Sequence, residues 1–408
     1  MTQEFKEMLE IFSSACVNSE SKLNITCDTE VILQKAYEQS VFHLVFAGLK
    51  PYYENNNIVI NDYDEINSYV LSTCSDRKIK NSLCYDFLNQ LSDMDIKYAV
   101  LKGDTLSKYY KYPAMRLSGD IDILIDEKDE AKVLEFMSKN GFTYEARNEG
   151  NNHTVCFHPV YGVVEVHISL YCNFMDDLWF KNTNELEEYT YVDLPDRKEP
   201  TLSITDGYIY TVFHTIKHFL SNGLSVKQMM DIVLYTKENF NEINFKKAFG
   251  IFEENQFLRM VYCIYYISNH YFNIKIFDDF DNFDVVSEKL LTECENSGAF
   301  GKKSDLKDFF EVYTKMKIDK SKQNDFQSYM TSWRRKSLKG YLSMSEMNMK
   351  LKYPNLKTGK ARIVHLKNIL KKGFKYSYKI KQFVKYKPQS ISGEMENRIE
   401  IIKELNMI

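Results

Sequence analysis

Apolar residues recur at intervals of three and four positions over most of the first 92 residues. The stretches VILQKAYEQSVFHLVFAGL (31–49) and KNSLCYDFLNQLSDM (80–94) both show this spacing. A period near 3.6 residues places apolar side chains on one face of a helix. The pattern therefore predicts an N-terminal helical region over residues 1–93.

The pattern changes at residue 98. A short apolar run (98–101) predicts a strand that ends at Gly103, and TLSKYYKY (105–112) predicts a helix up to Pro113. GDIDILID (119–126) predicts a second strand, and EKDEAKVLEFMSKNG (127–141) predicts an amphipathic helix that stops at Gly141. HTVCFHPVYGVVEVHISLY (153–171) predicts two strands around a tight turn at residues 161–162. Together these elements make a small α/β unit over about residues 94–172.

Helical spacing returns after residue 201. The segments 205–223, 225–240 and 245–272 predict helices, and Thr205 and Asp206 are expected to cap the first of them. The last hundred residues are rich in Lys and Tyr and predict helices interrupted at Pro354 and Pro388. We therefore predict an α+β, mostly α chain with four parts: an N-terminal helical region (1–93), an α/β core with a short mixed sheet (94–200), a helical domain (201–330) and a basic helical region (331–408).

Composition narrows the class of protein. The 408 residues are 44% hydrophobic and 27% charged, which is typical of a soluble globular chain, and no run of apolar residues is long enough to span a membrane. The first residues lack the basic segment and the following apolar segment of a signal peptide, so we expect none. The eight Cys are scattered without a CxxC pair, which argues against a zinc knuckle or a disulfide framework and favours a reducing, cytoplasmic setting.

Charge is distributed unevenly along the chain. The net charge is −4, but residues 331–390 hold 17 Lys and Arg against one acidic residue, Glu346. Such a segment suggests an anionic partner, either a membrane surface or a nucleic acid, or the acidic remainder of the same chain. A solvated helical face or an ordinary lid with inward-facing aromatic residues explains the same composition.

Three carboxylates fall within the predicted strands. Asp120 and Asp122 share one face of a strand because side chains alternate, and Ile121 faces the other way. Glu165 similarly shares a face with His167. Alternatively, Asp120 and Asp122 are two surface carboxylates, and Glu165 and His167 form a purely structural pair. Since unpaired carboxylates are costly to bury, the apolar neighbours of Asp120 and Asp122 favour a bound cation.

Three carboxylates on neighbouring strands suit a pair of Mg²⁺ ions, which prefer oxygen ligands and can support in-line phosphoryl transfer. The turn at Gly103, with Lys102 before it and a helix start after it, could face an anion, although most such turns bind nothing. The sequence has no GxxxxGK[ST] loop and no protein-kinase motif set, so a P-loop enzyme and a kinase are excluded.

These motifs resemble a known family. LKGDTLSKYY, MRLSGDIDILI and VVEVHISLY are similar to the nucleotidyltransferases related to DNA polymerase β, and more narrowly to the bacterial branch known as uncharacterised nucleotidyltransferases. HTIKHFLSNGLSVKQMMDIVLY (214–235) and the region from KYPNLK to HLKNILKK also resemble that branch, so the likeness covers most of the chain. The resemblance implies a polymerase β-like α/β core with helical regions on both sides.

The resemblance also implies roles for individual residues. Asp120 and Asp122 would be ligands of Mg²⁺ or Mn²⁺, and Glu165 would be the third carboxylate and the base for the acceptor hydroxyl. Gly103 would mark the loop that covers the triphosphate, with charge supplied by the neighbouring cations Lys102 and Arg116.

The resemblance also suggests a few further residues for the nucleotide site. His214, Lys217 and His218 lie on one helix face that could meet the nucleotide; a polar face at the seam between domains is the alternative. Asp231 is expected to pair with one of these three. Asp104 replaces the Ser usual in the superfamily, which would repel a triphosphate unless its carboxylate turns away.

The resulting functional expectation is an enzyme that moves a nucleoside monophosphate from a nucleoside triphosphate to an unidentified acceptor and releases pyrophosphate. AMP, UMP and CMP transfer are equally compatible with the sequence. A weak or inactive nucleotidyltransferase-fold scaffold that acts through its basic C-terminal region is the alternative, and a metal-dependent hydrolase is a third possibility.

Overall fold

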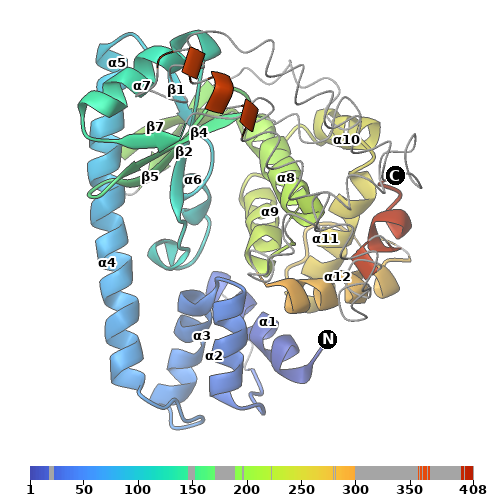
Figure 1. The fold of residues 1–408 in the computed structure, drawn as a ribbon. Helices are drawn as coiled ribbons and strands as arrows, with labels where there is room; N and C mark the ends of the chain where they lie inside the picture. Colours follow the sequence, from blue (N-terminus) through green and yellow to red (C-terminus); the bar gives the residue numbers. More distant parts are fainter. Residues whose placement is uncertain are drawn as a thin grey trace.

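A computed structural model describes residues 1–17, 23–145, 152–170, 189–194, 197–221, 223–278, 280 and 282–298, and short stretches between residues 357 and 407. Within these residues the chain is a mixed α/β protein in which one sheet lies beside two groups of helices (Figure 1). The predicted α+β class, mostly helical with a mixed sheet, is confirmed.

The sheet is mixed and has seven strands in the order β3-β4-β5-β2-β1-β7-β6. Strands β2 and β5 are parallel, as are β1 and β7, while the other neighbouring pairs are antiparallel. The strands are β1 (Tyr98–Val100), β2 (Asp120–Ile125), β3 (Thr143–Glu145), β4 (His153–His158), β5 (Gly162–His167), β6 (Tyr189–Leu194) and β7 (Arg197–Leu202). The predicted strands at 98, 119 and 153–171 are therefore confirmed.

The sheet is wider than the sequence predicts, because β3, β6 and β7 were not expected. β7 reads RKEPTL, and its charged residues and Pro200 do not suggest a strand. The antiparallel ladder with β6 and a contact with β1 build it into the sheet. Between β1 and β7, the Tyr98 hydroxyl donates a hydrogen bond to the fully buried Glu199.

The N-terminal helices match the apolar spacing of the first 93 residues. They are α1 (Gln3–Cys16), α2 (Thr29–Glu38), α3 (Phe42–Glu54), α4 (Tyr63–Leu88) and α5 (Gln90–Asp93). The Thr2 side chain caps α1 by accepting from the Phe5 N–H, and the Asp28 side chain caps α2 in a similar way. The long helix α4 runs along one side of the molecule, from the N-terminal helices to the sheet (Figure 1).

The helices between the strands differ in length from expectation. α6 (Asp104–Ser107) is one turn long, so the predicted helix over 105–112 is wrong beyond Ser107; a 3₁₀ turn, η1 (Pro113–Met115), follows. A second 3₁₀ turn, η2 (Glu127–Asp129), leads into α7 (Glu130–Lys139). After α7, Gly141 takes a φ of +89°, as expected for a residue that ends a helix.

A second helical group follows the sheet. It comprises α8 (Ile204–Ser221), α9 (Val226–Glu238), α10 (Phe245–Glu254), α11 (Leu258–Tyr271) and α12 (Asp284–Ser297). The expected caps of α8 are wrong: Thr205 and Asp206 lie inside its first turn, and the Ser203 side chain accepts from the Asp206 N–H (3.3 Å). None of the described helices combines the length and apolar character required to span a bilayer.

Two large apolar clusters hold these layers together. One joins α1–α3 with α8–α12 and the segment 401–407 near the chain end. The other packs α4 and α7 against one face of the sheet. The opposite face of β2 carries Asp120 and Asp122 at its polar end and Leu124 in a small apolar cluster. The division at residues 93, 200 and 330 stays a prediction, and most of the basic region 331–408, with its proposed membrane or nucleic-acid partner, lies outside the described residues.

Candidate active site

The three predicted carboxylates meet on the polar face of the sheet. Asp122 lies opposite Glu165 in the parallel ladder of β2 and β5, and Asp120 is two residues earlier on the same face. One carboxylate oxygen from each of the three lies within 4.8 Å of the other two. Ile121 and Val164 face the apolar cluster on the other side, which confirms the predicted alternation.

Asp122 is the buried centre of this group. Its side chain has no exposed surface, its Oδ1 accepts a hydrogen bond from His167 Nε2 (3.0 Å), and the same oxygen lies 3.1 Å from Lys102 Nζ. Within the described residues its Oδ2 has no hydrogen-bond partner. A buried carboxylate oxygen without a partner is costly. The oxygen-rich donor set, with one oxygen left over, therefore fits a divalent cation.

Lys102 connects the sheet to helix α8. Its Nζ lies 3.9 Å from Asp120 Oδ2 as well as close to Asp122, and it donates to His214 Nε2 (3.1 Å). Burial acts to lower the pKa of Lys102, but the carboxylates of Asp122 and Asp120 outweigh it and raise the pKa above its ordinary value. Burial and the adjacent Lys102 lower the pKa of His214, so this ring is neutral and can accept the hydrogen bond.

Glu165 is the partly exposed member, with 21% of its side chain accessible. Burial acts to raise its pKa, but the hydrogen bond with His167 and the Lys102 ammonium hold the pKa at about 2. The carboxylate is therefore ionised at neutral pH, as a cation ligand must be.

His153 is a site residue that sequence reasoning missed. It pairs with His167 across the antiparallel strands β4 and β5, and its Nε2 lies 3.8 Å from Glu165 Oε2. His153, Glu165 and His167 form a second group whose ligand atoms lie within 4.8 Å of one another. Burial lowers the pKa of His153 to about 4, so the ring is neutral. The sequence signal that could have identified His153 is its position in the predicted hairpin, where it pairs with His167 on the neighbouring strand.

The loop at Gly103 adopts the conformation that its glycine permits. Gly103 has φ +79°, and Asp104 begins α6 directly after it. The Asp104 carboxylate accepts a hydrogen bond from Asn81 Nδ2 on α4 (2.8 Å). Asp104 is thus held toward α4 by a neutral donor, which answers how a carboxylate can be accommodated at this position.

Arg116 has partners other than those the resemblance implies. Its Nε and Nη2 donate to the two carboxylate oxygens of Asp231 (2.6 and 2.7 Å), and its Nη1 donates to the Gly103 carbonyl (3.1 Å). Tyr110 also donates to Asp231 (2.7 Å). The structure thus pairs Asp231 with Arg116, and this buried ion pair ties the Gly103 loop to helix α9.

The predicted face of α8 lies beside the carboxylates. His214 contacts Lys102, and His218 Nε2 lies 3.2 Å from His214 Nε2. Lys217 lies close enough to His153 to contribute to the low pKa of that ring. The structure therefore brings Lys102, His214 and His218 together as one connected polar group.

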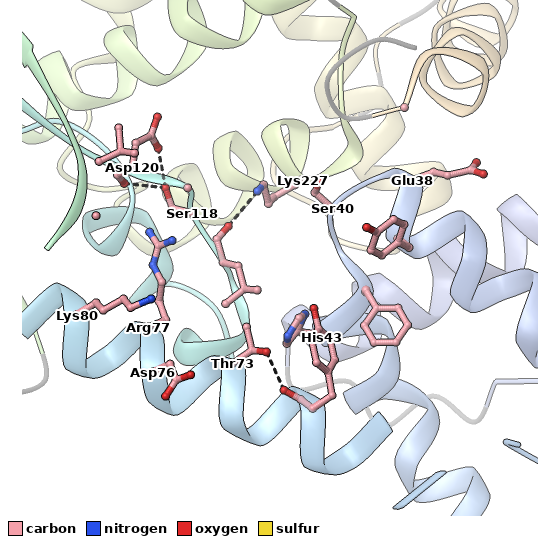
Figure 2. A pocket seen from close by; sticks show the side chains of 18 of the residues that line it. Glu38, Ser40, His43, Thr73, Asp76, Arg77, Lys80, Ser118, Asp120 and Lys227 are labelled. Carbon is pink, nitrogen blue, oxygen red and sulfur yellow. Dashed lines mark hydrogen bonds between the residues drawn. The ribbon is translucent and has the colours of Figure 1, made fainter. Parts of the chain in front are cut away.

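A large cavity adjoins this site. It has a volume of about 1220 Å³ and lies among α2, α3, α4, the start of β2 and the beginning of α9 (Figure 2). Asp120 and Ser118 line one end, where the Ser118 hydroxyl donates to Asp120 Oδ1 (3.1 Å). Sequence reasoning missed its lining residues His43, Arg77 and Lys227. For His43 and Arg77, the sequence signal that could have found them is a polar position on a face of an N-terminal helix.

Comparison with known proteins places the chain in a family. The model of the family described as "Uncharacterised nucleotidyltransferase" matches residues 28–273, more than half of the chain. No curated protein matches the sequence.

Two solved structures are similar in part. The lincosamide antibiotic adenylyltransferase LnuA, solved with lincomycin bound, is 18% identical over 37% of this chain and 93% of its own, with a TM-score of 0.26. An antigenic nucleotidyltransferase-like protein from Paracoccidioides brasiliensis is 14% identical over 49% of this chain and 94% of its own, with a TM-score of 0.29. Because these TM-scores are low, the assignment rests on the family match, and by that match the chain belongs to the uncharacterised nucleotidyltransferase family.

Proposed function

We propose that this protein transfers a nucleoside monophosphate from a nucleoside triphosphate to an acceptor hydroxyl and releases pyrophosphate. The observation that supports this best is Asp122, the fully buried member of the group of three carboxylates, whose Oδ2 has no hydrogen-bond partner in the described part of the chain. Family membership is consistent with the same reaction type.

In the proposed reaction the acceptor oxygen forms a bond to the α-phosphorus, and the bond from this phosphorus to the bridging oxygen breaks. The acceptor proton passes to Glu165, and pyrophosphate carries away the electron pair of the broken bond. Asp120, Asp122 and Glu165 would hold two Mg²⁺ or Mn²⁺ ions, which when bound would neutralise the phosphate charge that develops.

The surrounding residues have supporting roles in this proposal. Lys102 holds Asp122 and Asp120 in place. The backbone at Gly103 and Asp104 covers the phosphates, and Arg116 holds that loop in shape through the Gly103 carbonyl. His214, Lys217 and His218 form the opposite wall, on α8.

The test uses the full chain with each of the four nucleoside triphosphates, labelled at the α-phosphate, and a small-molecule cell extract as the acceptor source. We expect a labelled adduct and pyrophosphate to form only with Mg²⁺ or Mn²⁺. Asp122→Asn should lower the rate by at least about 100-fold, because it removes one charged ligand.

Asp126→Asn is the matched control. Asp126 follows β2, its side chain is 55% exposed, and it pairs only with the exposed Lys128 among the described residues. The variant should keep wild-type activity. Unchanged turnover in Asp122→Asn would contradict the proposal, and release of free nucleoside monophosphate without an adduct would indicate a hydrolase.

A further inference from the structure

We propose that the cavity beside Asp120 binds the nucleoside triphosphate, with the phosphates at its cationic end and the base at its aromatic end. This inference rests on the proposed function for the identity of the donor. It adds a binding site built largely by α2, α3 and α4, with the starts of β2 and β5 at one end.

The cationic end lies next to the carboxylates. Arg77 extends from α4 toward Ser118 and Asp120, and Lys80 is one turn further along the same helix (Figure 2). Lys227 lines the cavity from α9 and donates to the Leu117 carbonyl (3.0 Å). Burial lowers the pKa of Arg77, while the nearby carboxylates of Asp104 and Asp120 act to raise it. Lys80 is exposed and lines the same end of the cavity. Two such cations beside the Gly103 loop suit a polyphosphate.

The two cations that the sequence predicts for the phosphates, Arg116 and Lys102, already have partners within the protein. Arg116 uses its guanidinium nitrogens on Asp231 and the Gly103 carbonyl, and Lys102 is committed to Asp122, Asp120 and His214. A triphosphate therefore needs charge from elsewhere. Arg77 and Lys80 can supply it from helix α4.

The other end of the cavity is aromatic and has an unpartnered nitrogen. His43 is 6% exposed, and within the described residues its Nε2 has no hydrogen-bond partner. Its ring centroid is 5.7 Å from that of Tyr69 and 5.8 Å from that of Phe42. Tyr69 is 53% exposed and lines the cavity, so its ring is accessible to a ligand there. A planar ring with hydrogen-bonding groups, such as a nucleobase, could stack here and satisfy His43.

Helix α4 sets the distance between the two ends. Tyr69, Thr73, Asp76, Arg77 and Lys80 all line the cavity and lie on one helical face. At a rise of 1.5 Å per residue, the 11 steps from Tyr69 to Lys80 cover about 16.5 Å. This length can hold a polyphosphate at one end and a planar ring at the other, which neither inorganic phosphate nor a free base would require.

The experiment measures binding by calorimetry without an acceptor, using tripolyphosphate and each of the four nucleoside triphosphates, with Mg²⁺ and with EDTA. We expect Arg77→Met and Lys80→Met each to weaken both tripolyphosphate and nucleotide binding about tenfold. Lys78→Met, on α4 but outside the cavity, is the matched control and should bind as wild type.

His43→Phe tests the aromatic end, because it keeps a ring of similar size and removes the nitrogen. It should weaken the tightest-binding nucleotide about tenfold and leave tripolyphosphate binding unchanged. Wild-type nucleotide affinity in both Arg77→Met and His43→Phe would overturn the inference, as would absence of nucleotide binding by the wild type.

These results separate the two proposals. If nucleotide binds through Arg77 and His43 but no transfer product forms, the proposed function fails and the cavity assignment stands. If Asp122→Asn abolishes transfer while the cavity variants keep wild-type affinity, the cavity assignment fails alone.

Discussion

Asp122 and Glu7 are both buried carboxylates, but their hydrogen-bond partners differ. Glu7 accepts hydrogen bonds from the backbone N–H groups of Thr26 and Cys27 and from the side chains of Thr26 and Gln3. Both of its oxygens are therefore used, whereas one oxygen of Asp122 has no partner among the residues that the structure describes. Glu7 thus ties α1 to the segment before α2, whereas the remaining oxygen of Asp122 supports its proposed role as a cation ligand.

The tie made by Glu7 predicts a pH-dependent stability. Burial acts to raise its pKa, but the hydrogen bonds prevail and hold it at about 2, below the ordinary value of 4.5. The carboxylate thus contributes about 3 kcal/mol above pH 4.5, and this contribution is lost as the pH falls toward about 2. Glu7→Gln should lower the free energy of unfolding at pH 7, and the difference from wild type should shrink in acid.

Denaturant unfolding at a series of pH values measures this difference. Glu253→Gln, at an exposed position on α10, is the control and should leave the unfolding curve unchanged. A Glu7→Gln penalty that stays constant from pH 7 to pH 3 would show that the carboxylate charge does not contribute.

At the scale of elements, the buried pair of Arg116 and Asp231 fastens the Gly103 loop to α9. Both side chains are at least nine-tenths buried, and the ion pair is bidentate. Removing one partner leaves an unpaired buried charge, which costs about 3–5 kcal/mol. Arg116→Met should therefore destabilise the protein by about this amount.

The double variant Arg116→Met with Asp231→Leu checks this reasoning. It removes both charges, so it should recover much of the lost stability when unfolding is followed by circular dichroism. If the double variant is less stable by the sum of the two single losses, the ion pair is not the cause.

Sequence reasoning at this scale succeeded where an element has its own period and failed where packing decides. The spacing in α1 to α4 and α7 and the alternation in β2 and β5 are local, so these elements were predicted. β7 has no such alternation and exists because β6 and β1 pair with it. The helix after Asp104 was overestimated because the chain turns after Ser107, and the Lys111 N–H donates to the Cys16 carbonyl of α1 (3.0 Å) instead of continuing the helix.

At the scale of the whole molecule, residues near the chain end complete the main apolar core. Ile401, Ile402, Leu405 and Met407 have no exposed surface and belong to the cluster of α1–α3 and α8–α12. Nearby, Arg398 makes a buried ion pair with Glu293 on α12. The end of the chain is thus part of the fold.

Ile402→Ala should lower the free energy of unfolding by about 2–5 kcal/mol, because it leaves a cavity in this core. Thermal and denaturant unfolding measure the loss, with the exposed neighbour Lys403→Ala as the control. Equal stability of the two variants would place the segment outside the core.

The sequence by itself determined which side chains share a face. A strand alternates with a period of two, so Asp120 with Asp122, and Glu165 with His167, could be assigned to one face without knowing the fold. The family resemblance extended this to a nucleotidyltransferase, and the family match confirmed it.

Only the tertiary structure decided which distant residues meet. It paired Arg116 with Asp231, set His153 opposite His167, and placed the cations of α4 beside Asp120. Local periodicity determines the direction in which a side chain points, but its partner depends on how elements far apart in the chain pack together. The carboxylates could therefore be found from the sequence, and the cavity that we propose for their substrate could not.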